Sequence, residues 1–416
     1  MSILREGYKD TEIGVIPVDW EVVKLQDISK ITMGQSPKSN TYNTDNIGIP
    51  LIQGNADCKN RKTIPRTYTT ELTKECFVGD SIMTVRAPVG AISKSLHNAC
   101  IGRGVCAIQS KEDNEYIYHS LIDYEDKWTK LSQGSTFTAV SGNDVKSIKI
   151  PLPPLKEQEK IASILSTADE KIEAIAEQIQ KHETLKKGLL QKLLSEGIGH
   201  TEFKESELGS LPVRWEVVKL GNIGNLEGGF AFKSKEYTDN KLDYQVIRMS
   251  NINSKGLNLS KDPKYIHSIE KRTEKYILNV NDLLITLTGT IGKTDYGNIA
   301  LISEDRKMVL NQRVGRFVIN SSNNTTQFLY YVFNHQLFRS KFFEFGKGGT
   351  GNQANVGRRD FETIKIILPP LQEQKQIADI LSTADEKLEV LRAKKEKFET
   401  LKKGLLQKLL SGEVRV

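Results

Sequence analysis

Polar side chains that hydrogen-bond nucleobases and phosphates gather in loops in both halves of this sequence. Asparagine, glutamine and arginine can read base edges, and lysine, arginine and serine can contact phosphate oxygens. The candidate DNA-contacting residues are Gln35, Ser36, Lys38, Gln53, Asn55, Arg86, Arg103, Ser135 and Thr136 in the first half, and Lys233, Lys235, Arg248, Asn251, Lys293, Gln312, Arg313, Lys347, Asn352 and Gln353 in the second. A single loop of this kind is better explained as a solvated turn. Because such loops recur at equivalent places in the two halves, they are candidates for contact with nucleic acid.

The sequence offers no candidate for a catalytic or metal-binding site. Residues 288–294 resemble a phosphate-binding loop, but Leu287 stands where that pattern requires its first glycine. The six histidines are scattered, with no pair at the spacing of metal ligands. Neither an Asn-Pro-Pro-aromatic site for amine methylation nor a convincing PD-(D/E)xK nuclease pattern is present. We therefore predict a binding protein that is not an enzyme.

The segments that carry these loops form an internal repeat of two copies along the chain. The first copy begins with Gly14, Pro17 and Trp20, and the second begins with Gly209, Pro212 and Trp215. Near the end of each copy, residues 183–195 (ETLKKGLLQKLLS) are repeated without change as residues 399–411. A repeat of this length predicts two domains of the same fold. The interiors of the two copies differ strongly, so we expect two similar scaffolds with different surfaces.

A long helix is predicted at the end of each copy. Residues 157–195 contain no proline and are rich in helix-forming residues, and Pro151, Pro153 and Pro154 fix the start of this helix. The apolar spacing of four and three residues is that of a coiled-coil seam. The seam residues are Ile161, Leu165, Ala168, Ile172, Ile175 and Ile179 in the first copy, and Ile377, Leu381, Ala384, Leu388 and Leu391 in the second. We predict that the two helices pair antiparallel and act as a spacer about 57 Å long. The alternative is that each helix packs only on its own domain.

A broader leucine stripe follows each seam. Its residues are Leu185, Leu189, Leu190, Leu193 and Leu194, with Leu401, Leu405, Leu406, Leu409 and Leu410 in the second copy. A stripe of this width predicts contact with more than one neighbour, such as the partner helix together with a domain or another subunit.

The interiors of the copies read as short strands broken by turns, with one helix in each. Strands are expected at residues 81–85, 104–108, 282–287 and 316–319, and helices at residues 114–131 and 326–343. The predicted fold class is α+β, with a pseudo-twofold internal repeat. We predict a first domain at residues 1–150, a central long helix at 151–198, a second domain at 199–367 and a C-terminal long helix at 368–416.

The composition fits a soluble globular protein of two or three domains. The chain has 416 residues, a net charge of +7 and 38% hydrophobic residues. A mild basic excess suits a polyanionic partner without proving one. The four cysteines form no CxxC pair and are expected to be reduced thiols. No apolar run approaches the length that crosses a bilayer, so we expect a cytoplasmic protein.

The doubled order of motifs closely resembles the specificity subunits of type I restriction-modification enzymes. Each copy has a Gly-x-x-Pro-x-x-Trp motif, a variable domain, a Pro-Pro-Leu-x-Glu-Gln turn and a long helix. The turns lie at residues 151–158 and 368–374, and the resemblance covers essentially the whole chain. The first copy departs from the pattern at residues 102–105 (Gly-Arg-Gly-Val), where the second has Asn-Gln-Arg-Val.

This resemblance implies that each domain reads one half of a gapped double-stranded DNA site, while the paired helices set the gap. It implies that adenine methyltransferase (modification) subunits, two in number, bind this chain, and it admits motor-nuclease (restriction) subunits as further partners. S-adenosylmethionine, ATP and Mg²⁺ would belong to those partners, with no cofactor in this chain. Because the two interiors differ, the target should be asymmetric.

Two other functions remain open from the sequence. In the first, the chain is a coiled-coil interaction scaffold that does not bind DNA. In the second, it is a stand-alone DNA-binding regulator without a methyltransferase. Substitution of the basic and amide loops separates the first from DNA recognition, and tight specific binding by the chain alone would indicate the second.

Overall fold

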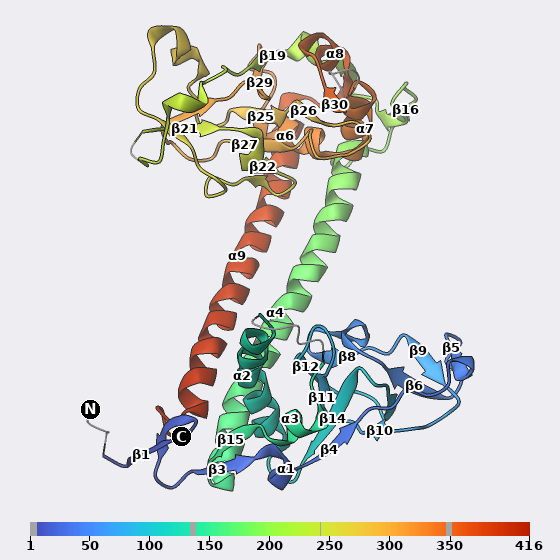
Figure 1. Ribbon diagram of the computed structural model, residues 1–416. Coiled ribbons are helices and arrows are strands. Elements are labelled where there is room, and N and C mark those ends of the chain that lie inside the picture. Colours follow the sequence, from blue (N-terminus) through green and yellow to red (C-terminus); the bar gives the residue numbers. More distant parts are fainter. Residues whose placement is uncertain (1–5, 134–138, 242, 347–351) are drawn as a thin grey trace. The chain divides into compact units, whose positions relative to one another are not determined.

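The chain forms two compact units, of which the first combines two segments from distant parts of the sequence and the second is one continuous segment. The computed structural model describes residues 6–133, 139–241, 243–346 and 352–416 (Figure 1). The first unit consists of Met1–Glu177 with Arg392–Val416, and the second consists of Gln178–Leu391. The predicted four-part division into recognition domains and helices is a different division and stays a prediction. Within the described ranges, no helix is both long enough and apolar enough to cross a membrane.

The first unit is built on two mixed sheets and several short helices. Its five-stranded sheet has the order β10 (Glu75–Cys76), β13 (Ala99–Ile101), β6 (Ile49–Ile52), β9 (Thr67–Thr69) and β5 (Tyr42–Asn43). Its six-stranded sheet has the order β4 (Ser29–Met33), β14 (Val105–Ser110), β11 (Ser81–Thr84), β12 (Ile92–Lys94), β8 (Lys62–Thr63) and β7 (Cys58–Lys59). Two further strand pairs are β1 (Tyr8–Thr11) with β2 (Gly14–Pro17), and β3 (Glu21–Lys24) with β15 (Lys149–Leu152). The helices are α1 (Leu25–Ile28), η1 (Ser39–Thr41), η2 (Asn55–Asp57), α2 (Asn114–Gln133) and α3 (Gly142–Lys146).

The second unit repeats this plan with two four-stranded sheets. One has the order β19 (Gly224–Gly228), β29 (Val314–Ile319), β25 (Leu283–Thr286) and β27 (Ile299–Leu301), and the other β20 (Tyr237–Thr238), β24 (Tyr265–Ile266), β21 (Tyr244–Ile247) and β28 (Met308–Leu310). The strand pairs are β16 (Phe203–Lys204) with β17 (Leu211–Pro212), β18 (Glu216–Lys219) with β31 (Lys365–Leu368), β22 (Ile252–Asn253) with β23 (Gly256–Leu257), and β26 (Thr288–Thr290) with β30 (Gln353–Asn355). The helices are α5 (Leu220–Ile223), η3 (Ser234–Glu236), η4 (Met249–Asn251), η5 (Lys271–Tyr276), α6 (Thr326–Asn334), α7 (Gln336–Glu344) and α8 (Arg358–Thr363). The predicted α+β class with an internal repeat is confirmed.

One predicted helix is divided in two. Residues 326–343 were expected to form one helix, but α6 ends at Asn334 and α7 begins at Gln336. His335 between them has an extended backbone (φ −75°, ψ 146°), and its Nδ1 accepts a hydrogen bond from Leu337 N–H at 3.4 Å. The sequence-based expectation was wrong here because histidine acts as an N-cap and starts a new helix.

Two long helices, α4 (Leu155–Ser195) and α9 (Leu371–Leu410), each contribute to both units (Figure 1). In the first unit, Ile161 and Leu165 of α4 share a core with Leu406 and Leu409 of α9. Further along α4, Asp169 binds Lys402, which lies earlier in α9, so these helix segments run antiparallel. In the second unit, Leu193 and Leu194 of α4 share a core with Ile377 and Leu381 of α9. Eight predicted seam residues are buried, namely Ile161, Leu165, Ala168, Ile175, Ile377, Leu381, Leu388 and Leu391, and Ile172, Ile179 and Ala384 are partly exposed.

The leucine stripes mostly pack against the domains. Leu193 and Leu194 are buried in the core of the second unit, together with Trp215 and Phe361. Leu185, at the start of the stripe, is 54% exposed. Within each unit, the other long helix and the domain therefore cover most of the apolar surface of the leucine stripe.

The repeated motifs meet in each unit. Trp20 is fully buried and its indole N–H donates to Glu157 Oε2 at 3.0 Å, so the first motif binds the turn that begins α4. In the second unit Trp215 donates to Glu373 Oε2 at 2.9 Å in the same way. A buried tryptophan needs a hydrogen-bond acceptor for its N–H, and a glutamate at the helix start supplies one. The negative charge of this glutamate also interacts favourably with the positive end of the helix dipole.

Candidate nucleic-acid interface

In the first unit, the ends of three strands bring several predicted DNA-contacting residues to one edge. Gly102, after β13, donates its N–H to Ile52 O at 2.8 Å, which places Gln53 beside it. The N–H of Gln35, after β4, donates to Ile101 O at 2.9 Å. Arg103 N–H donates to Ser36 Oγ at 3.2 Å. The turns that carry Gln35, Ser36, Gln53 and Arg103 are therefore joined directly.

Gly104 is required by this close approach of the turns. A Cβ at this position would lie 2.1 Å from Gln53 O, closer than real Cβ contacts allow. The carbonyl of Gly104 accepts from Val85 N–H at 2.9 Å, and the next residue, Arg86, is exposed. Arg86 therefore belongs to the same edge as Arg103.

Other predicted residues of the first unit lie beside this edge or outside it. Asn55 is exposed in η2, two residues after Gln53. Lys38 is exposed at the start of η1, and its backbone N–H donates to Glu71 Oε2 at 2.9 Å. Ser135 and Thr136 fall outside the residues that the structure describes.

The second unit has the same arrangement of strand ends with other side chains. Asn311 N–H donates to Ile247 O at 3.1 Å, which brings the turn after β28 next to Arg248. Gln312 N–H donates to Phe230 O at 3.0 Å, just after β19. The carbonyl of Arg313 accepts from Leu287 N–H at 3.1 Å, as Gly104 does from Val85. Gln53 is thus equivalent to Arg248, Arg103 to Gln312, and Gly104 to Arg313.

A hollow of about 500 Å³ opens at this edge of the second unit. It is lined by Arg248, Met249, Ser250, Ile252, Asn253, Lys261, Asp295, Asn298, Asn311 and Arg313. Arg248 Nε and Ser250 Oγ are buried without a hydrogen-bond partner among the described residues. Buried donors that lack a partner cost free energy, so they suit a site that a polar ligand completes. Sequence reasoning missed Asp295 and Asn298, because only folding brings their turn to this edge.

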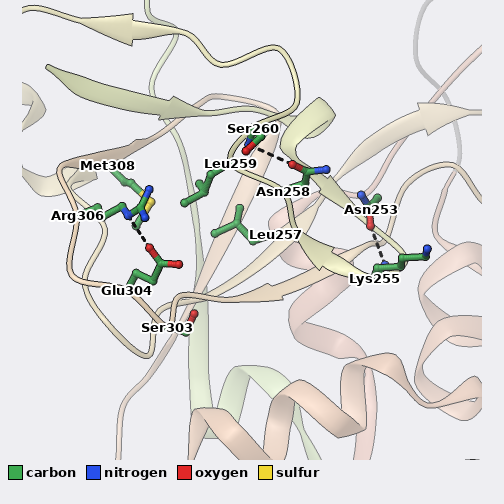
Figure 2. Close-up of a pocket in the computed structure, with 10 residues that line it drawn as sticks. All are labelled: Asn253, Lys255, Leu257, Asn258, Leu259, Ser260, Ser303, Glu304, Arg306 and Met308. Carbon is green, nitrogen blue, oxygen red and sulfur yellow. Dashed lines mark hydrogen bonds and ion pairs between the residues drawn. The ribbon is translucent and has the colours of Figure 1, made fainter. Parts of the chain in front are cut away.

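A second hollow, of about 440 Å³, shares Asn253 with the first (Figure 2). Arg306 and Glu304 line it and form an ion pair, with 2.5 Å between Nε and Oε2. Asn258 Oδ1 accepts from Ser260 N–H at 3.1 Å within its wall. Figure 2 shows this internal pairing among the lining residues of the second hollow.

The remaining predicted residues of the second unit differ in accessibility. Asn251 is fully buried, and its side chain accepts from Arg248 N–H at 3.0 Å and donates to Lys261 O at 2.7 Å. This side chain therefore shapes the turn that carries Arg248. Lys233 and Lys235 are exposed around η3, and Lys293 is exposed in the turn after β26.

The pair of strands β26 and β30 carries the last predicted residues. Asn352 is exposed, and its carbonyl accepts from Ile291 N–H at 3.1 Å. Gln353 pairs with Thr290. Lys347 lies outside the described residues. No group of three histidine, cysteine, aspartate or glutamate side chains in the described ranges is placed to hold a metal ion.

Behind the surface, a polar contact ties the long helices together in each unit. Lys402 of α9 binds both carboxylate oxygens of Asp169 of α4, at 2.6 and 2.7 Å. In the second unit the roles are exchanged, since Lys186 of α4 binds Asp385 of α9. The sequence shows these lysines only as polar interruptions of an apolar pattern.

One residue of α2 or α6 lies beside each of these contacts. Tyr331 of α6 donates to Asp385 Oδ2 at 3.0 Å. At the equivalent place in α2, His119 is 1% exposed and its Nδ1 lies 4.0 Å from Asp169 Oδ2. Burial, assisted by the positive charge of Lys402, lowers the pKa of His119 to about 3. His119 is therefore neutral at physiological pH.

Comparison with known proteins gives consistent matches over nearly the whole chain. The family model described as "Type I restriction modification DNA specificity domain" matches residues 17–184 and again residues 212–400. The type I restriction enzyme MjaVIII specificity subunit of Methanocaldococcus jannaschii is 29% identical over 434 residues, covering 99% of this chain and 97% of that protein. The EcoBI specificity subunit of Escherichia coli is 22% identical, covering 95% and 86%. The crystal structure of a type I S subunit from M. genitalium superposes with a TM-score of 0.64 at 16% identity, covering 94% of this chain and 96% of that one.

Proposed function

This chain belongs to the type I restriction-modification DNA specificity family, and from that premise we propose that its two domains read the two different halves of an asymmetric, gapped DNA site. The chain is the DNA-recognition subunit of a type I system and is itself non-catalytic. One observation carries the proposal of an asymmetric site. Equivalent strand ends, held by equivalent backbone hydrogen bonds, present Gln53 and Gly104 in one unit but Arg248 and Arg313 in the other. Different side chains on the same frame would select different base pairs.

The exposed cations and amides divide the work of binding. Lysines such as Lys38, Lys233 and Lys293 would contact phosphates and supply affinity that falls steeply with salt concentration. Gln53, Arg103 and the arginines of the second unit would face the groove and supply the choice of sequence. The net charge of +7 supports the electrostatic part of this mechanism.

The partners of this subunit are the modification and restriction subunits of its system. We infer that two adenine methyltransferase subunits bind it, because the scaffold that would receive them is present twice, with Trp20–Glu157 in one unit and Trp215–Glu373 in the other. S-adenosylmethionine, ATP and Mg²⁺ would be held by those partners, and the complex would act in the cytoplasm. The methyltransferase would flip its adenine out of the duplex, a step that costs a few kcal/mol and is offset by binding of the whole complex.

An exchange of one domain tests the proposal. Residues 26–148 are replaced by the corresponding interior of a related specificity subunit, and the chain is expressed with its methyltransferase partner. Mapping of N6-methyladenine across the host genome should show one changed half-site and one retained half-site. The reciprocal exchange of the second interior is the matched control and should change the other half. If both halves change after one exchange, the two domains do not read DNA independently.

A further inference from the structure

The hollow at the edge of the second unit contains groups of both charges. Arg313 and Lys261 contribute positive charge, Asp295 contributes negative charge, and Asn298 and Asn311 contribute amides. A phosphate site would exclude a carboxylate, because the two anions repel each other. The edge of a base pair carries both donors and acceptors, and it suits this mixed lining.

Arg313 has a guanidinium that is open to a ligand. Its side chain is exposed, and no hydrogen bond or ion pair joins it to another residue in the described part of the chain. Its neighbour Arg248 is different, because Nη2 of Arg248 donates to Asp262 Oδ2 at 2.8 Å. The backbone of Arg313 is fixed by the bond from Leu287 N–H. A fixed backbone with an unengaged guanidinium is the arrangement expected of a residue that reads a base.

Asp295 is held in place as an ionised acceptor. Thr290 donates to it twice, from its backbone N–H to Oδ1 at 2.9 Å and from its hydroxyl to Oδ2 at 2.8 Å. These bonds lower the pKa of Asp295, so the carboxylate stays charged at neutral pH. Each carboxylate oxygen can accept a further hydrogen bond. Asp295 is therefore oriented, charged and still able to accept from a ligand.

A guanine–cytosine pair presents the complement of these two groups. Guanine offers the acceptors O6 and N7 in the major groove, and cytosine offers the N4 amino donor. We propose that the second unit reads a G·C pair, with Arg313 donating to guanine and Asp295 accepting from cytosine. This assignment rests on the proposed DNA-recognition function and names one base pair within the half-site.

The first unit lacks both groups at the equivalent positions. Gly104 stands in place of Arg313, and a side chain there would collide with Gln53. Gly90 N–H donates to Thr84 O in the first unit, and Gly297 N–H donates to the equivalent Thr286 O in the second. Two residues before these glycines stand Pro88 in the first unit and Asp295 in the second, so Pro88 takes the place of Asp295. The G·C contact is thus a property of the second half-site.

The experiment compares the methylated motif of the wild-type complex with that of three single variants. Arg313→Gln and Asp295→Asn each remove one proposed base contact. Arg306→Gln is the matched control for Arg313→Gln, because it makes the same substitution in the other hollow, where Arg306 is paired with Glu304. Each chain is expressed with its methyltransferase partner, and N6-methyladenine is mapped across the host genome.

Arg313→Gln and Asp295→Asn should both relax the same G·C position of one half-site, with discrimination there falling about 10- to 100-fold. The other half-site should be retained, which shows that the variants fold and assemble. Arg306→Gln should keep the full motif. An unchanged motif in Arg313→Gln, or relaxation of different positions by the two variants, overturns the G·C assignment alone. If the wild-type complex methylates no gapped motif, the proposed function fails together with this inference.

Discussion

Removal of the Lys402 ammonium should destabilise the first unit by a measurable amount. The side chain of Lys402 is only 10% exposed and binds both oxygens of Asp169, whereas the side chain of Asp169 is 36% exposed. Breaking a fully buried pair costs about 3–5 kcal/mol, and an exposed pair contributes about 0–1 kcal/mol. Because Asp169 keeps part of its hydration, we expect Lys402→Met to lower the free energy of unfolding by about 2 kcal/mol.

The cysteines provide an assay that reports on this unit alone. All four cysteines lie in the first unit, and Cys76, Cys100 and Cys106 are fully buried. A thiol reagent applied briefly at increasing urea concentrations labels these residues only where the unit opens. The midpoint of labelling should move to lower urea in Lys402→Met. A loss of about 2 kcal/mol also corresponds to a fall in Tm of roughly 4–8 °C for a unit of this size.

The matched control is Lys395→Met, which makes the same substitution on the same helix. Lys395 is paired with Glu399 at 3.4 Å on an exposed surface, so its replacement should cost less than about 0.5 kcal/mol. Combining Lys402→Met with Asp169→Leu should recover most of the lost stability, because no charge is then left without a partner. If Lys402→Met shifts the midpoint no more than Lys395→Met does, this pair does not hold the helices together.

Two further predictions concern His119 of α2 and the long helices α4 and α9. Because the pKa of His119 is about 3 in the folded protein and near 6.5 in an unfolded chain, the unfolded state binds the proton first as the pH falls. The contribution of His119 should be nearly constant above about pH 7 and should decrease stability by about 2 kcal/mol at pH 5. Urea unfolding followed by fluorescence should therefore show that the difference in stability between His119→Tyr and the wild type shifts by this amount in favour of the variant between about pH 7 and pH 5. Deletion of one heptad from both helices, residues 172–178 and 388–394, should shorten the gap of the methylated motif by about three base pairs, since seven helical residues span about 10 Å. A gap of unchanged length in that variant would contradict the spacer role.

Local pattern was enough to predict the scaffold from the sequence. The seam from Ile161 to Ile175 and its copy in α9 show a regular apolar spacing, and all of these residues except Ile172 and Ala384 are buried. Lys186 and Lys402 are visible in the sequence only as breaks in the pattern, because their partners Asp385 and Asp169 lie 199 and 233 residues away along the chain. Contacts at that separation leave no periodic signal. The same limit hid Asp295, whose place beside Arg313 depends on how two turns meet after folding.

The way the recognition edge is built explains why its side chains can differ so much between the two units. The turns are joined by backbone hydrogen bonds, Gly102 N–H to Ile52 O in one unit and Asn311 N–H to Ile247 O in the other. Backbone bonds do not depend on side-chain identity, so a glycine and an asparagine occupy the same position without altering the frame. Apart from positions without room for a side chain, such as Gly104, substitutions at this edge can therefore change the base pair that is read while the fold and the helix pairing stay the same. We infer that a new half-site specificity requires only a few changes at these strand ends.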